Sequence, residues 1–152
     1  LKIKQGVMDK VKEHLFHRVH ELPIGPNKTI KANFTPDPDI ADLWTKATKG
    51  KLPLDEAKRF LRLIAHEYVE SRLMEKGLPY RSSHPDAYKL GYNMPTPKHH
   101  GAHDLAPIVD AARAPFGHWE KMLGRKPPDF EFASDLSNLD ELVDLIWKGI
   151  KR

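Results

Sequence analysis

The sequence contains no cysteine. This absence excludes a disulfide-stabilised fold, a thiol nucleophile and any zinc site built on thiolates. Metal binding or catalysis by this chain must therefore depend on histidine, carboxylate and hydroxyl side chains.

Long apolar runs are also absent. No run approaches the ~20 residues that a membrane-spanning helix needs, and the first residues, Leu1-Lys-Ile-Lys-Gln, lack the pattern of a signal peptide. With 39% hydrophobic and 30% charged residues, the 152-residue chain has the composition of a folded domain and not of a disordered tail. We expect one domain over residues 1–152 and no membrane span.

Three motifs that would point to familiar chemistry are missing: G-x-x-x-x-G-K-[ST], G-x-G-x-x-G and G-x-S-x-G. A nucleotide-binding loop and a Ser/His/Asp hydrolase therefore have no support. Charge of neither sign dominates, since 25 Lys and Arg stand against 21 Asp and Glu (net +4). This small positive surplus permits a nucleic-acid partner without requiring one.

Apolar periodicity and thirteen prolines predict the fold. We expect a mainly α fold of five or six helices with long Pro-rich loops and room for one small β-hairpin. Residues 30–38 can hold only a short edge strand, because Pro36 and Pro38 cannot donate to a ladder. The predicted helices cover residues 7–21, 39–49, 54–76, 83–91, 105–123 and 138–150. Pro107 and Pro115-Phe-Gly interrupt the pattern over 105–123, so we expect a break or kink there.

The predicted helix over 54–76 carries the string His66-Glu-x-x-Glu70. On a helical wheel Glu67 falls inside the apolar arc that includes Leu63 and Met74, with His66 and Glu70 on its border. A carboxylate in such an arc must be paired, bound to a metal or shifted in pKa. His66 and Glu70 could supply half of a metal site, with Glu67 as general acid or base. The alternative is a surface His66–Glu70 pair and a Glu67 paired to Lys or Arg.

Nine histidines are available to complete a site for a divalent cation such as Zn, Mg or Mn. His84 is a candidate ligand and catalytic residue downstream of the helix. The predicted loop over 93–103 adds His103 as a candidate ligand and His99 and His100 as candidate substrate contacts, since loops often carry sites. A solvated loop is the alternative.

A further basic group occupies the predicted helix over 7–21. Lys12, His14 and His20 could contact a phosphate-bearing substrate. A solvated basic helix face explains these residues equally well.

Four short motifs, in order, resemble the C-terminal toxin modules of Rhs/YD-repeat and related bacterial polymorphic toxins. They are Lys12-Glu-His-Leu-Phe16, Phe34 to Trp44 (F-x-P-D-x-x-I-A-x-x-W), His66-Glu-x-x-Glu70 and Tyr80-Arg-Ser-Ser-His84. The resemblance covers residues 11–90, and Ser83 stands where such modules more usually have alanine.

This resemblance implies an antibacterial effector that is exported by a bacterial secretion system and acts in the cytoplasm of a target cell. It also implies two partners, a large Rhs-type carrier and a cognate immunity protein. The activity we expect is hydrolysis of nucleic acid at a His/Glu site formed by His66, Glu67, Glu70 and His84. The alternatives are a zincin-like metallopeptidase that uses His-Glu-x-x-Glu, and a non-enzymatic structural or processing module of the carrier.

Overall fold

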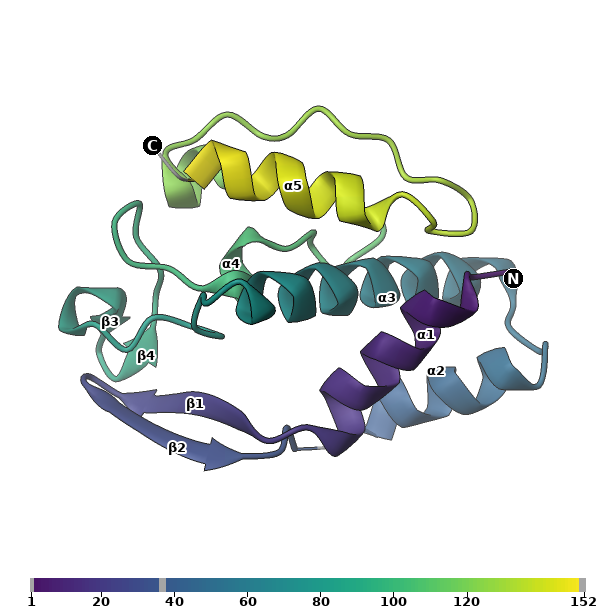
Figure 1. The fold of residues 1–152 in the computed structure, drawn as a ribbon, viewed down its shortest axis with the longest axis horizontal. Coiled ribbons are helices and arrows are strands. Elements are labelled where there is room, and N and C mark those ends of the chain that lie inside the picture. The colour runs from purple at the N-terminus through teal and green to yellow at the C-terminus, as the bar shows by residue number, and fades with distance from the viewer. Residues whose placement is uncertain (1, 36–37, 151–152) are drawn as a thin grey trace.

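A computed structural model describes residues 2–35 and 38–150 and shows a mainly α fold around one long central helix (Figure 1). Pro36 and Asp37, which belong to the second motif and to the predicted edge strand, lie outside the described residues. The elements are α1 (Gln5–Lys12), a π-helical turn (Glu13–His17), β1 (His20–Gly25), β2 (Lys28–Ala32), α2 (Pro38–Thr48), α3 (Leu54–Glu75), a 3₁₀ turn (Pro85–Ala87), β3 (Tyr88–Lys89), β4 (Tyr92–Asn93), α4 (Ala102–Leu105), a second π-helical turn (Trp119–Leu123) and α5 (Leu139–Ile150).

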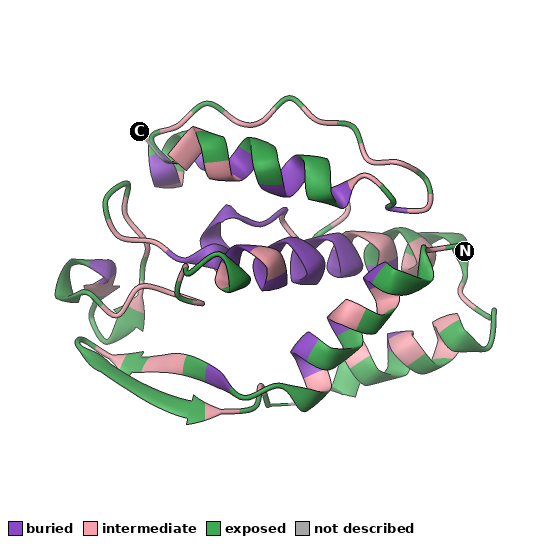
Figure 2. Cartoon of the chain, in the orientation of Figure 1, coloured by how far each residue is buried: buried purple, intermediate pink, exposed green. Residues whose placement is uncertain are grey.

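Helix α3 forms the centre of the molecule because other helices cover it from several sides. It contacts α1, α2, α4 and α5, and α1 and α5 flank it on opposite sides (Figure 1). Every residue from Leu63 to Ser71 is buried, as the continuous purple segment in Figure 2 shows. A helix enclosed in this way buries its polar residues too, so His66, Glu67 and Glu70 lie inside the molecule.

The structure confirms the mainly α prediction and three of its helices almost to the residue. These are α2, α3 and α5, each of which has a clear apolar stripe and acidic residues in its first turn. The small hairpin is confirmed as β1 and β2, which pair antiparallel with His20 opposite Ala32. Among the described residues no helix is both long and apolar enough to cross a bilayer.

The predicted helix over 7–21 is too long. Helix α1 ends at Lys12, the π-helical turn ends at His17, and Arg18 is already extended. His20 and Glu21 belong to strand β1, where Glu21 pairs with Lys31. This pairing joins residues ten positions apart, which local periodicity does not reveal.

Two further helix predictions are wrong. Residues 83–91 contain a 3₁₀ turn, strand β3 and the tight turn into β4, which Leu90 and Gly91 close with positive φ (53° and 82°). In place of a helix over 105–123, α4 ends at Leu105, two residues before Pro107, and only Trp119–Leu123 is helical again.

Candidate metal centre

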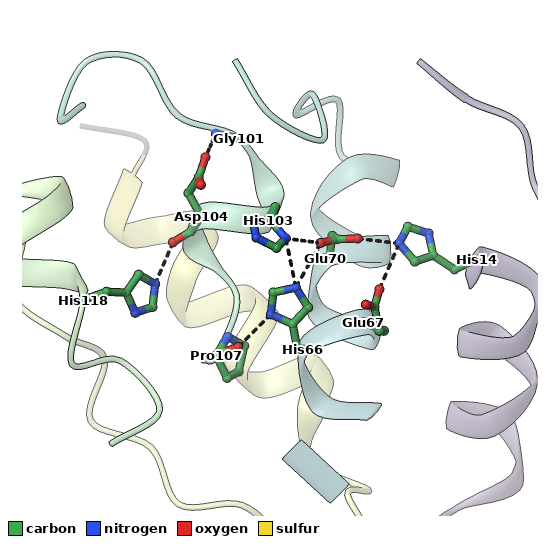
Figure 3. A network of polar contacts seen from close by, with 9 residues as sticks. All are labelled: His14, His66, Glu67, Glu70, Gly101, His103, Asp104, Pro107 and His118. Carbon is green, nitrogen blue, oxygen red and sulfur yellow. Dashed lines mark hydrogen bonds and ion pairs between the residues drawn. The ribbon is translucent and has the colours of Figure 1, made fainter. Parts of the chain in front are cut away.

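Three side chains from two helices meet at one point beside α3. His66 and Glu70 lie one turn apart on α3, and His103 comes from α4 (Figure 3). The distances are 3.1 Å from His66 Nε2 to Glu70 Oε2, 3.1 Å from His103 Nδ1 to Glu70 Oε2, and 3.2 Å between the two nitrogens. We call these three residues the α3 triad; their ligand atoms form a nearly equilateral triangle.

If His66 is neutral, hydrogen bonds alone cannot make all three contacts of this triangle favourable. His66 Nδ1 lies 2.7 Å from the Pro107 carbonyl oxygen, which can only accept, so Nδ1 carries a proton. In neutral His66 the Nε2 atom is then an acceptor, and it faces the acceptor oxygen of Glu70. An additional proton or a cation between these atoms is needed to make the contact favourable.

The same triangle fits one face of a tetrahedral metal site. An ion with metal–ligand bonds of about 2.0–2.1 Å separates its ligand atoms by about 3.3 Å. The backbone carbonyl of Pro107 fixes the ring of His66, as a second partner usually does for a metal-binding histidine. The α3 triad could therefore hold a metal ion.

A close approach of two backbone segments positions His103. The Ala102 N–H donates to the Pro79 carbonyl (2.8 Å), and the His103 N–H donates to the Tyr80 carbonyl (3.0 Å). A Cβ atom at Gly101 would lie 2.5 Å from the Tyr80 carbonyl oxygen. Only glycine permits this approach, so Gly101 is part of what places His103 against α3.

Two more buried residues, His14 and Glu67, lie beside the second oxygen of Glu70 (Figure 3). Together with the α3 triad they form what we call the cluster. His14 Nε2 lies 2.8 Å from Glu70 Oε1 and 3.7 Å from Glu67 Oε2. His14 belongs to the first π-helical turn, a distortion often found at functional sites. The ring of His20 donates from Nε2 to the His14 carbonyl oxygen (2.7 Å), which ties the turn to the start of β1.

The charges in this cluster are mutually dependent. Burial opposes ionisation of Glu70, but hydrogen bonds from His103, His14 and His66 outweigh it and hold its pKa well below the usual range. Burial also opposes a charge on His66, yet its hydrogen bond with Glu70 and the charges of Glu70 and Glu67 raise its pKa to about 9. Burial and the charge of Glu70 raise the pKa of Glu67 to about 8. Near neutral pH the cluster therefore binds protons where a cation could bind instead.

Two hollows reach the cluster, and each contains an arginine. Glu67 and Glu70 line a cavity of about 440 Å³ together with Arg81. His66 and His103 line a hollow of about 260 Å³ that also includes Arg113. Each hollow therefore brings residues of the cluster and an arginine to one lining.

Of the predicted site residues, the structure brings five together: His14, His66, Glu67, Glu70 and His103. The alternative that His14 and His20 belong to a solvated basic helix face is wrong, because both are buried. Their contact with a phosphate-bearing substrate stays a prediction. His14 follows Val7 and Val11 at spacings of seven and three, so it shares their apolar face, and that spacing is the sequence signal for its burial.

The remaining candidates lie elsewhere. His84 does not join the α3 triad; with Asp86 and His99 it forms a separate group, which we call the surface triad. The ring of His100 bonds within its own loop, 3.0 Å from the Thr96 carbonyl. Lys12 is exposed and lines a third hollow, between α1 and α2.

Comparisons with protein-family models, with curated proteins and with solved structures find no match to this chain.

Proposed function

We propose that this chain is a metal-dependent hydrolase that cleaves nucleic acid, with the α3 triad as the ligands of a divalent cation. The triangle of His66 Nε2, His103 Nδ1 and Glu70 Oε2 carries this proposal, because all three distances fall between 3.1 and 3.2 Å. Two imidazoles and a carboxylate suit Zn²⁺ or Mn²⁺.

The cluster offers suitable chemistry for hydrolysis. When bound, a divalent cation polarises a phosphoryl oxygen and lowers the pKa of a water molecule. Three ligands from the chain leave positions for water and substrate. Glu67 supplies a second carboxylate beside the triad, and its Oε2 atom has no hydrogen-bond partner among the described residues.

The arginines favour a phosphodiester as the substrate. Arg81 shares a cavity with Glu67 and Glu70, and Arg113 shares a hollow with His66 and His103. Guanidinium groups bind phosphate oxygens in bidentate fashion and stabilise the charge that develops in phosphoryl transfer.

Cleavage of plasmid DNA and of total RNA tests this function. The protein is stripped with a chelator and reloaded separately with Zn²⁺, Mg²⁺ and Mn²⁺. We expect cleavage with at least one ion and a loss of about 10²-fold or more in Glu67→Gln and in His66→Ala. Asp86→Asn, in the surface triad, is the matched control and should cleave like the wild type. Intact nucleic acid with every ion at high protein concentration would overturn the proposal.

A zinc peptidase is the second candidate, and one observation favours it. Two histidines and one glutamate are the ligand set of a large class of zinc peptidases, and Glu67 follows His66 directly, as the general base does in H-E-x-x-H. This candidate predicts nearly one zinc per purified chain, loss of that zinc in His66→Ala, and cleavage of an unfolded protein such as casein while nucleic acid stays intact.

The biological setting we propose is an antibacterial effector, exported on a large Rhs-type carrier and neutralised in the producing cell by an immunity protein. The four motifs over residues 11–90 support it. Expression of the wild-type and Glu67→Gln genes inside a bacterium, with and without the adjacent gene, tests it. We expect toxicity only from the wild type and rescue by the neighbour. Equal toxicity of both would instead favour a module that acts without enzymatic activity.

A further inference from the structure

The carboxylate of Glu70 faces two different sets of ligand atoms. Its Oε2 atom contacts His66 and His103 of the α3 triad, at 3.1 Å each. Its Oε1 atom lies 2.8 Å from His14 Nε2, and that nitrogen lies 3.7 Å from Glu67 Oε2. Glu70 is 1% exposed, so neither oxygen is free to turn toward solvent.

We propose that His14, Glu67 and Glu70 form a second divalent-cation position, with Glu70 as a bridge between two ions. This inference rests on the proposed function, because the first ion is the one bound by the α3 triad. Two carboxylates and one imidazole suit a harder cation than the first position, such as Mn²⁺ or Mg²⁺.

The distances permit this arrangement. A cation with bonds of about 2.1 Å can bridge two ligand atoms that lie up to about 4.2 Å apart. Both measured separations, 2.8 and 3.7 Å, fall within that span. A carboxylate that binds one ion through each oxygen is compatible with the spacing of about 3.5–4 Å typical of two-metal hydrolases.

An unsatisfied atom points to a missing ligand at this second position. Glu67 is 9% exposed, and its Oε2 atom lacks a hydrogen-bond partner among the described residues. It reaches only to 3.7 Å from His14 Nε2, which is beyond hydrogen-bond distance. Glu67 and Glu70 also line the cavity of about 440 Å³, so the second position borders a hollow with room for water.

The surface triad is a weaker candidate for a second ion. The rings of His84 and His99 are stacked, with centroids 3.6 Å apart and an angle of 4° between their planes. An imidazole binds metal in its own plane, so two parallel rings do not direct their lone pairs to one point. The His84 Nδ1 atom is also occupied, because it accepts the Asp86 N–H at 3.0 Å.

A second ion would assign Glu67 a different role from the one it has in a peptidase. With two ions, Glu67 is a ligand and the centre is of the kind that stabilises both the attacking and the leaving oxygen of a phosphodiester. With one ion, Glu67 stays available as a general base. The number of bound ions therefore separates the two candidate activities.

Manganese binding counts the positions directly. Metal-free protein is titrated with Mn²⁺, the bound metal is quantified after gel filtration, and low-temperature electron paramagnetic resonance tests for coupling between ions. We expect two ions per wild-type chain and an exchange-coupled spectrum. His14→Ala and the nearly isosteric Glu67→Gln should each retain one uncoupled ion, bound at the α3 triad. His103→Ala should also retain one uncoupled ion, bound at the second position. Asp86→Asn should retain two.

One ion per wild-type chain, or two in both His14→Ala and Glu67→Gln, would overturn the second position. Circular dichroism verifies that each variant is folded, and Glu67→Gln provides the test if His14→Ala is not. Failure of the proposed function gives a different result from failure of the second cation position. A single ion with metal-dependent cleavage of nucleic acid keeps the proposed function and removes the bridge. Two coupled ions without any cleavage keep the bridge and remove the function.

Discussion

The α3 triad and the surface triad have the same kinds of ligand and very different surroundings. In the α3 triad the side chains of His66 and Glu70 are 5% and 1% exposed, and that of His103 is 31% exposed. In the surface triad the side chain of Asp86 is 74% exposed and that of His84 45%. Asp86 Oδ2 lies 3.8 Å from each of the two surface histidine rings, too far for a hydrogen bond.

The difference lies in how well the two groups are suited to a metal ion, although the ligand atoms of both lie close together. The α3 triad has converging atoms and a ring fixed by the Pro107 carbonyl, so little conformational entropy is lost when an ion binds. The surface triad has parallel rings and solvated groups that would have to reorganise. Fixed orientation is what distinguishes the two groups.

Removal of the shared carboxylate should produce the largest effect. Glu70→Gln replaces a charged ligand by a neutral amide, and we expect the affinity for Zn²⁺ to fall by more than about 100-fold, since even outer partners of a ligand contribute about 10–100-fold. Asp86→Asn makes the same chemical change in the surface triad and should alter affinity less than about twofold. Competition with a chromogenic chelator measures both. The reverse result would move the metal site to the surface.

Metal removal should be visible in the thermal stability. An ion at 100 times its dissociation constant stabilises the native state by about 2.7 kcal/mol, which raises the Tm of a chain of this length by about 5–10 °C. Calorimetry with Zn²⁺ and with chelator should show this shift in the wild type and in Asp86→Asn. The shift should vanish in Glu70→Gln. Its loss in Asp86→Asn alone would contradict the assignment.

Backbone constraints near the two triads can be compared through two glycines. Gly101→Ala introduces a Cβ atom 2.5 Å from the Tyr80 carbonyl oxygen, so we expect a loss of about 1–3 kcal/mol in the free energy of unfolding. Gly91→Ala meets no atom within 4 Å but must adopt φ +82°, at a cost of about 1–2 kcal/mol.

Only Gly101→Ala should change the affinity for Zn²⁺. Because the segment at Gly101 positions His103, Gly101→Ala should also weaken Zn²⁺ binding by about tenfold or more. Gly91→Ala should leave the affinity unchanged. Urea unfolding and chelator competition on the same samples measure both quantities, and equal affinities in the two variants would show that the backbone approach does not position His103.

Local pattern predicted the part of the site that lies on one helix. His66, Glu67 and Glu70 occupy fixed angles on α3, so their positions relative to one another follow from helical periodicity alone. The helices α2, α3 and α5 were predictable for the same reason. Nothing in this reasoning needed contacts between distant segments.

The positions of His14 and His103 in the site depend on contacts between segments that are distant in the sequence. His14 reaches Glu70 from a π-helical turn that interrupts the first helix, and no residue type signals that turn in advance. His103 and His84 both follow proline-containing segments, but the backbone bonds of Ala102 and His103 to Pro79 and Tyr80 decide which one meets α3. Those bonds join residues more than twenty positions apart, beyond what spacing along the chain can show.

The smallest expected effect concerns His118, which lines the hollow beside the α3 triad and donates to the Asp104 carbonyl at 2.7 Å. Burial lowers its pKa below the ordinary value of 6.5, although the bond to Asp104 opposes this shift. As the pH falls below about 6.5, the unfolded chain binds a proton that the folded chain resists, so the free energy of unfolding decreases. His118→Gln keeps a donor for the carbonyl but cannot titrate. Between pH 7.5 and 5.5, urea unfolding should therefore show a smaller decrease in the free energy of unfolding in this variant than in the wild type. An equal or larger decrease in the variant would show that the surroundings of the α3 triad do not disfavour charge at this position.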